Sequence, residues 1–156
     1  MTATHNSGEN TFVVLHMGER RLALPSGLIA ELAPPVRLHK FPTTSPHISG
    51  VIVRRKKIVP VYDFRNFLGG RKSSANLFYL IARCAVGGSS ELCAMPVNGE
   101  CELLSGAFQP ATMEDSEYVL GRLAVGEEHF EVLNLDALIA SDAAVAKDSA
   151  SSGVQR

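Results

Sequence analysis

Short apolar runs recur along most of the chain, interrupted about every 8 to 12 residues by glycine, proline or charged pairs. The runs are rich in residues that favour β-strands, and this pattern is typical of an antiparallel barrel or sandwich. It predicts about nine strands: residues 11–17, 20–24, 50–53, 58–62, 77–84, 91–97, 99–104, 118–125 and 129–133.

Turn signals join several of these strands into hairpins. Residues 50–62 form the clearest one, in which two apolar strands flank four consecutive cations, Arg54 to Lys57. Asn98 and Gly99 supply the strongest two-residue hairpin signal in the chain. A polar stretch over 105–117 is expected to be a loop.

Helices are expected to be few and short. Pro25 suits the first position of a helix with Leu28, Ile29 and Leu32 on its apolar face, and the prolines at 34–35 must stop it. Asp63 is a candidate N-cap for one or two helical turns that end at the glycines at 69–70. Residues 135–140 are expected to form a terminal helical turn.

Composition places one folded module between two tails. Residues 1–10 and 141–156 are small and polar, so we expect both to be disordered and the module to span 11–140. No apolar run approaches the roughly 20 residues that span a bilayer, and no targeting signal is readable at the start, so we expect a cytoplasmic chain without membrane insertion. The net charge of −1 indicates no overall field that would attract nucleic acid.

Motifs for catalysis or metal binding are missing from the sequence. The glycine-rich, nucleophile-elbow and zinc-protease signatures are absent, and the five histidines are scattered singly. Cys84, Cys93 and Cys101 are interpreted as small buried side chains, although strand pairing could bring them together as a nucleophile site. We therefore expect no enzyme, no cofactor and no metal.

The four cations at 54–57 are the one local feature with high charge density. On a hairpin tip they could contact phosphates, a carboxylate-bearing partner or only water. No aromatic residue interleaves them, which disfavours a base-stacking surface for nucleic acid.

The segment from 50 to 64 resembles the signature hairpin of CheW-like domains. Blocks at 29–32, 41–46, 93–98 and 118–139 are similar to further family segments, in the same order and with matching spacing. Within the hairpin the positions that match in register are Gly50, Val51, Ile52, Arg55, Pro60, Val61 and Asp63.

This resemblance implies an all-β fold of two intertwined five-stranded SH3-like β-barrels with a few short helices. It also implies a non-catalytic adaptor that couples methyl-accepting chemoreceptors to the histidine kinase CheA in chemotaxis-type signalling. In that family one subdomain docks on the kinase's regulatory domain, while the groove between the barrels and the hairpin arginine face the receptor tip. Ring assembly with the kinase is a further arrangement that the resemblance leaves open.

Carried over by register, Arg55 takes the place of the family arginine, and Glu31 with Leu32 lies near the groove. The chain departs from the family pattern at Val53, Arg54 and Lys56, where the family has Asn, Leu and Gly. Losing this glycine predicts a wider or differently shaped tip, since glycine adopts positive φ most easily. We expect protein contacts at Arg55, Arg54, Lys56, Glu31, Leu32 and Val53. The alternative is a small β-barrel that binds an anionic ligand or nucleic acid through the basic tip.

Overall fold

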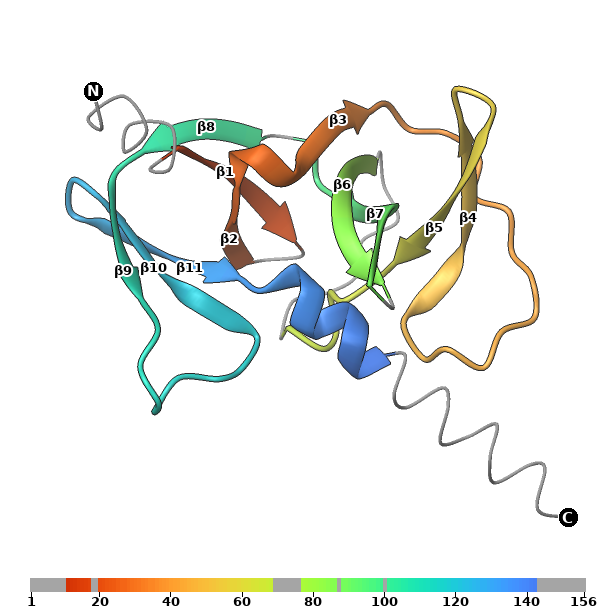
Figure 1. The fold of residues 1–156 in the computed structure, drawn as a ribbon. Helices are drawn as coiled ribbons and strands as arrows, with labels where there is room; N and C mark the ends of the chain where they lie inside the picture. Colours follow the sequence, from red (N-terminus) through yellow and green to blue (C-terminus); the bar gives the residue numbers. More distant parts are fainter. Residues whose placement is uncertain (1–10, 18–19, 69–76, 87, 100, 143–156) are drawn as a thin grey trace, which may run out of the picture.

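The computed structural model describes residues 11–17, 20–68, 77–86, 88–99 and 101–142, and most of them lie in β-strands (Figure 1). These residues also include a three-residue 3₁₀ helix, η1 (Ser26–Leu28), and a helix over 135–142. The eleven strands of the described part are β1 (Thr11–Met17), β2 (Arg20–Pro25), β3 (Ile29–Ala33), β4 (Ile48–Arg54), β5 (Lys57–Tyr62), β6 (Phe78–Val86), β7 (Ser89–Val97), β8 (Cys101–Ser105), β9 (Ala107–Pro110), β10 (Val119–Val125) and β11 (Glu128–Leu133).

The strands form two sheets whose order shows that the chain is intertwined. One sheet has the order β8-β1-β2-β11-β10-β9, and the other has the order β3-β6-β7-β5-β4. The chain therefore starts in the six-stranded sheet, builds the whole five-stranded sheet, and returns to complete the first one (Figure 1). The predicted all-β fold of two intertwined SH3-like subdomains is confirmed.

The sheets differ in two details from what the strand pattern indicates. One sheet has six strands because residues 107–110, interpreted as loop, pair with β10 in antiparallel register. The sheets are also mixed, since β11 pairs with β2 and β5 pairs with β7 in parallel. The parallel pairings join strands far apart along the chain, so local periodicity does not reveal them. β9 is too short to show a periodicity of its own.

Gly106 lets the six-stranded sheet bend round on itself. It separates β8 and β9, which stand at opposite ends of the strand order. A Cβ at this position would lie 2.2 Å from the carbonyl oxygen of Ala124. Only a residue without a side chain permits the close backbone approach that closes the sheet.

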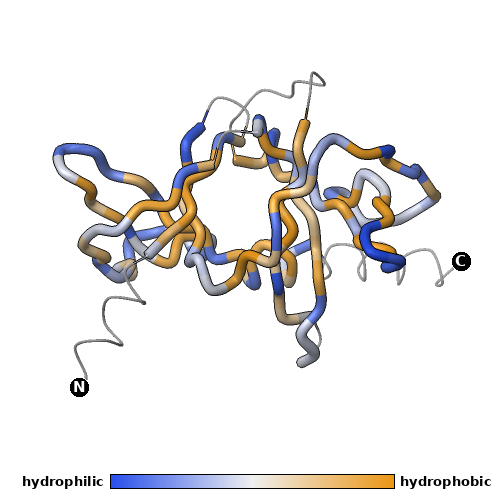
Figure 2. The backbone as a smooth tube through the Cα atoms, turned by 90° about the horizontal axis from the view of Figure 1, so that it is seen from above, coloured by the Kyte–Doolittle hydropathy of each residue, from blue (hydrophilic) through white to orange (hydrophobic). Residues whose placement is uncertain are grey.

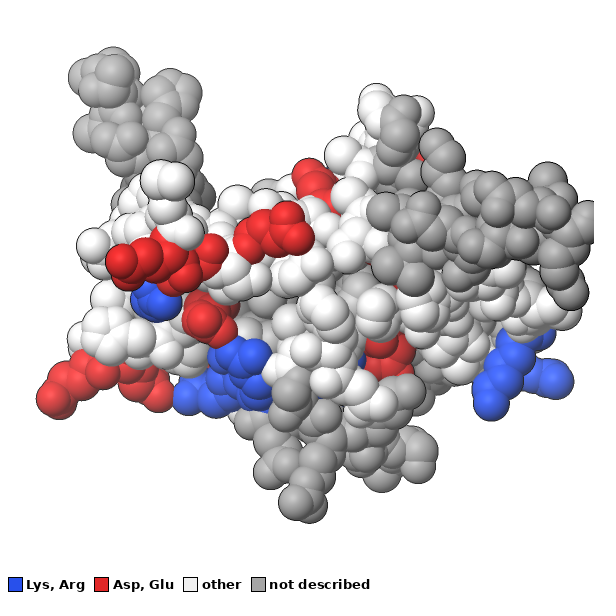
Figure 3. Space-filling model, turned by 90° about the horizontal axis from the view of Figure 1, so that it is seen from below, with Lys and Arg blue, Asp and Glu red and all other residues white. Residues whose placement is uncertain are grey.

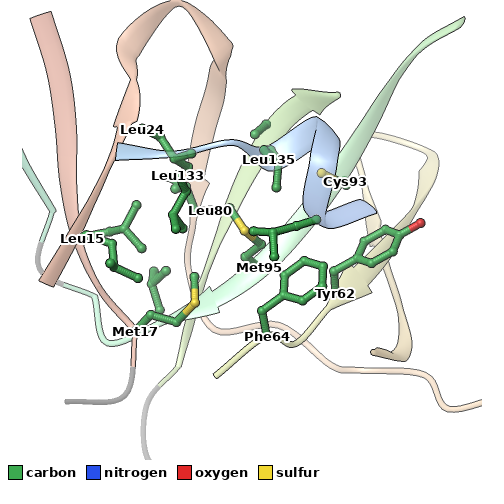
Figure 4. Packing of buried hydrophobic residues seen from close by; sticks show 14 of the residues in the cluster. Leu15, Met17, Leu24, Tyr62, Phe64, Leu80, Cys93, Met95, Leu133 and Leu135 are labelled. Atoms are coloured by element: carbon green, nitrogen blue, oxygen red, sulfur yellow. The ribbon is translucent and has the colours of Figure 1, made fainter. Parts of the chain in front are cut away.

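Buried apolar side chains form three clusters, the largest of which contains residues from both sheets (Figure 4). We call the largest cluster the shared core; it consists of Leu15, Met17, Leu22, Leu24, Tyr62, Phe64, Leu68, Leu80, Ala82, Cys84, Cys93, Met95, Val97, Leu133, Leu135, Leu138 and Ile139. The barrel core of the five-stranded sheet consists of Ala33, Ile52, Val59, Val61, Tyr79, Ile81 and Ala94. The barrel core of the six-stranded sheet consists of Phe12, Val14, Ala23, Leu123, Phe130 and Val132.

Central strands are buried on both faces. On β1, Val14 belongs to a barrel core and Leu15 to the shared core, and on β6 the same is true of Ile81 and Leu80. Burial on both sides explains why the sequence of β6 is a nearly continuous apolar run rather than an alternating one. In Figure 2 the hydrophobic stretches accordingly lie around the centre of the molecule, and the hydrophilic ones are most frequent in the outer loops. The two barrels thus share one interior.

The helix over 135–142 closes the junction between the sheets (Figure 1). The Asn134 side chain caps it by accepting a hydrogen bond from the Ala137 N–H at 3.2 Å. Its apolar face, formed by Leu135, Leu138 and Ile139, lies in the shared core. The predicted terminal helical turn is confirmed, and it extends two residues beyond 140.

The predicted helix after Pro25 is wrong. Only Ser26–Leu28 form a turn of 3₁₀ helix, and the chain then continues as β3, which pairs with β6. The apolar positions that suggested a helix suit a strand equally well, and long-range pairing with β6 decides between them. Of the one or two helical turns expected after Asp63, the described residues form one turn, in which the Leu68 N–H donates to the Phe64 carbonyl at 2.9 Å.

Several expectations fall on residues outside the described part. These are the disordered tail at 1–10, most of the tail at 141–156, and the helix end at 69–70. The 11–140 boundary of the folded module stays a prediction, although Ser141 and Asp142 belong to the last helix.

Candidate functional site

The β4–β5 hairpin ends in a tight two-residue turn. Arg54 and Lys57 are the last paired residues, and Arg55 and Lys56 between them have φ values of 52° and 67°. Positive φ at both central residues defines the turn whose twist matches that of the strands. The prediction of a wider tip is therefore wrong. The turn is tight, although each non-glycine residue in this conformation costs about 1–2 kcal/mol.

Glu31 on β3 organises the cations at this tip. Its Oε2 accepts hydrogen bonds from Arg54 Nε at 3.1 Å and Nη2 at 2.9 Å, and its Oε1 accepts one from Arg55 Nε at 3.2 Å. These donors, Arg54 foremost, hold the pKa of the Glu31 carboxyl below its ordinary value, although partial burial opposes them. The carboxylate is therefore ionised near neutral pH and fixes the direction of two arginines.

The exposure of the two arginines differs. The Arg54 side chain is 29% exposed, whereas that of Arg55 is 77% exposed. Arg54 thus serves mainly to join β3 to the hairpin, and most of the Arg55 side chain stays accessible to a partner.

A pocket of about 230 Å³ opens beside this cluster. Val59, Ile81 and Leu92 form its apolar part, and all three belong to, or pack against, the core of the five-stranded barrel. The remaining lining residues are Ala30, Glu31, Arg54, Arg55, Lys57 and Arg83. We call this feature the barrel-mouth pocket.

The charged rim of this pocket follows from strand geometry. Residues two apart on a strand face the same side of a sheet. On four strands of the five-stranded sheet, a charged residue lies two positions before or after an inward-facing core residue: Glu31 and Ala33, Arg54 and Ile52, Lys57 and Val59, and Arg83 and Ile81. The charges therefore form the layer next to the barrel core.

The other predicted site residues point elsewhere. Val53 lies directly opposite Ile58 in the hairpin, and the two are 53% and 72% exposed. Leu32 pairs with Leu80, so it faces away from Glu31 on the opposite side of β3. The structure thus brings together Glu31, Arg54 and Arg55, with Lys56 in the turn beside them, and separates Leu32 and Val53 from this cluster.

Sequence reasoning missed three residues at this end of the barrel: Lys57, Arg83 and Ile58. Lys57 was part of the noted charge cluster but was not selected. Arg83 is a lone cation inside an apolar run, and Ile58 is an exposed large apolar residue on the outer face of the hairpin. Both signals are visible in the sequence once the strand register is known.

The three cysteines lie in the shared core or pack against it. Cys84 and Cys93 are buried on adjacent strands, and Cys101 lies on β8 of the other sheet. The hydrogen bond between Cys84 and Cys93 holds the pKa of the Cys84 thiol below its ordinary value and, together with burial, raises the pKa of Cys93. Burial raises the pKa of Cys101. Cys84 donates a hydrogen bond to the Glu91 carbonyl at 3.4 Å. The interpretation as small core side chains accounts for these positions.

Neither a metal-binding cluster nor a membrane-spanning helix is found among the described residues. No group of three or more His, Cys, Asp or Glu residues there is arranged to hold a metal ion. No helix in that part of the chain has the length and apolar character needed to cross a bilayer.

The fold and this site define a class of small β-protein in which two barrels share a core and present a charged hairpin. The family model of the CheW-like domain matches residues 11–143, so the chain belongs to the CheW-like family of chemotaxis scaffold and adaptor proteins. The solved structure of the scaffolding protein TtCheW from Thermoanaerobacter tengcongensis is similar, with a TM-score of 0.70 and 23% sequence identity. That similarity covers 83% of this chain and 92% of the other. Among the curated proteins, none gives a significant match.

Proposed function

We propose that this protein is a non-catalytic, cytoplasmic adaptor that couples chemoreceptor-type sensors to a CheA-like histidine kinase. Family membership supports the adaptor role, and the ion-paired cluster of Glu31, Arg54 and Arg55 is the observation that carries the specific proposal. The resemblance in register implies that Arg55 corresponds to the arginine that faces the receptor in the family. Glu31 holds it in place beforehand, which lowers the ordering cost of binding.

The two partners would use different surfaces. The kinase's regulatory domain would dock on one barrel, and the receptor tip would contact Arg55, Lys56 and the exposed apolar residues Leu32 and Val53. Interfaces of about 1,000 Å² are individually weak, so assembly with the kinase into rings would supply the cooperativity that one contact lacks.

The direct test is binding of the full chain to the kinase regulatory domain and to a receptor tip encoded in the same genome. We expect Arg55→Glu to weaken receptor binding at least about tenfold and to change kinase binding by less than about twofold. Arg37→Glu is the matched control, because it reverses an exposed charge on the same barrel outside the cluster. Absence of binding to either partner at tens of micromolar would argue strongly against the proposal.

The second candidate function is binding of an anionic ligand or nucleic acid at the tip. The cations at 54–57 favour it, and it predicts an affinity that falls steeply with salt. It also predicts that Arg55→Glu combined with Lys56→Glu abolishes that binding. Salt-independent binding to the protein partners, with no measurable affinity for an oligonucleotide, would exclude it.

A further inference from the structure

We infer that the barrel-mouth pocket receives an acidic side chain of a protein partner, held by Lys57 and Arg83 above an apolar floor. The inference rests on the proposed function, because it supplies the chemistry of the segment that an adaptor of this kind would recognise. It concerns residues other than the Arg55 tip, which the family resemblance already assigns.

The charge of the pocket is unbalanced. Its lining contains four cations and one carboxylate, Glu31, which is already paired with Arg54 and Arg55. Among the residues that the structure describes, neither Lys57 nor Arg83 has an ion-pair partner within 4.0 Å. An incoming carboxylate would therefore meet two exposed cations that no described acidic side chain pairs with.

The size of the pocket favours a side chain over a whole small molecule. Its volume of about 230 Å³ is below the roughly 300–1,000 Å³ that small-molecule sites usually have. The floor of Val59, Ile81 and Leu92 adds an apolar surface on which the stem of a glutamate and a neighbouring apolar side chain can pack. None of the described residues that line the pocket is aromatic, so they offer no surface for stacking a nucleobase.

Charge is divided between the two halves of the molecule. The described residues of the five-stranded half, 29–68, 77–86 and 88–97, contain eight Lys or Arg and three Asp or Glu. The described strands and loops of the six-stranded half, 11–17, 20–25 and 101–133, contain three and seven. In Figure 3 most acidic side chains lie on the left, over the six-stranded half, with basic groups among them, and a further basic group lies at the far right. An acidic partner segment is thus steered toward the half that contains the pocket.

The test compares two short peptides, acetyl-Leu-Glu-Leu-amide and acetyl-Leu-Gln-Leu-amide, added to the isotope-labelled full chain. The backbone amide signals of Ile81 and Leu92 report binding. We expect the glutamate peptide to bind with a dissociation constant on the order of a millimolar, about fivefold or more tighter than the glutamine peptide. Equal binding of the two peptides, or no change at these amides up to about 10 mM peptide, would overturn the inference.

Substitutions that remove positive charge show which residues cause the preference for the glutamate peptide. Lys57→Gln combined with Arg83→Gln should remove the preference for the glutamate peptide, while Arg37→Gln combined with Lys40→Gln should keep it. These controls change the same charge on exposed residues of the same half, outside the pocket lining. A preference that survives the first pair, or tighter binding of a short RNA oligonucleotide at the same amides, would overturn the inference.

The two proposals fail in different ways. Binding to the kinase or receptor without any preference between the peptides would remove only this inference. A clear glutamate preference without binding to either protein would remove only the proposed coupling function.

Discussion

Replacing Asp142 with alanine should destabilise the protein strongly, because this carboxylate ties the last helix to the segment that leads into β4. Asp142 is 2% exposed and accepts hydrogen bonds from the Ser45 hydroxyl, from the His47 backbone N–H at 3.0 Å and from the His47 Nδ1 at 3.1 Å. The His47 ring packs at 5.0 Å from Phe64, a residue of the shared core. Truncation leaves at least two donors without an acceptor in a partly buried place, at about 1–3 kcal/mol each.

We therefore expect Asp142→Ala to lower the free energy of unfolding by about 3 kcal/mol. In urea this corresponds to a fall in the midpoint of about 1–2 M for a domain of this size. Asp142→Asn keeps an acceptor oxygen and should lose about 1 kcal/mol. Glu127→Ala, which removes an exposed acid from the β10–β11 turn, is the control and should change stability by less than about 0.5 kcal/mol.

Two results would refute this reasoning. A midpoint for Asp142→Ala within about 0.3 M of the natural chain would show that the contacts contribute little. An equal loss for Asp142→Asn and Asp142→Ala would show that the hydrogen bonds are not the cause.

Four further predictions concern the core, the barrel closure, the turn and alkaline pH. Met95→Ala, at a fully buried position of the shared core, should cost about 2–5 kcal/mol and keep a single transition in calorimetry and circular dichroism; separate transitions for the two barrels would contradict the shared interior. Gly106→Ala should lower the melting temperature, since its Cβ would lie 2.2 Å from a carbonyl oxygen, and an unchanged value would show that the backbone yields there. Lys56→Gly should raise stability by about 0.5 kcal/mol in urea by relieving positive φ, and a loss would mean that the lysine side chain contributes contacts. Burial, with the charge of Asp142, raises the pKa of Tyr62 to about 12, above its unfolded value near 10, so stability should fall as pH rises from about 10 to 12. Urea titrations should show a smaller fall for Tyr62→Phe, and an equal fall would refute the assignment.

The local sequence pattern was sufficient to predict elements whose contacts are made between residues close together in the chain. The hairpin at 50–62 was predicted with its charged tip because its two strands adjoin in sequence and their turn lies between them. The terminal helix was predicted because Asn134 and the apolar residues after it are consecutive. The matched hairpin positions, together with the order and spacing of the other blocks, carried the resemblance, and the family match over 11–143 confirms it.

The prediction of strands failed where the structure of a segment depends on residues outside it. β9 is four residues long and ends in proline, so nothing within it indicates a strand until β10 pairs with it. β3 has apolar spacing compatible with a helix, and only its pairing with β6 makes it a strand. The tightness of the tip was missed because the loss of glycine was weighed alone, without the strand twist that favours positive φ at both turn residues.

The barrel-mouth pocket lies beyond sequence reasoning for the same reason. Each strand contributes only one core residue and one charged residue two positions away, such as Ile81 and Arg83. This pattern occurs at the end of many strands. The pocket forms because β3, β4, β5 and β6 place their charged residues beside the same barrel core. This placement depends on the register between strands up to about fifty residues apart. The clustering of Lys57 with Arg83 is therefore a property of the closed barrel. A partner that binds both Lys57 and Arg83 therefore recognises the folded sheet rather than any single hairpin.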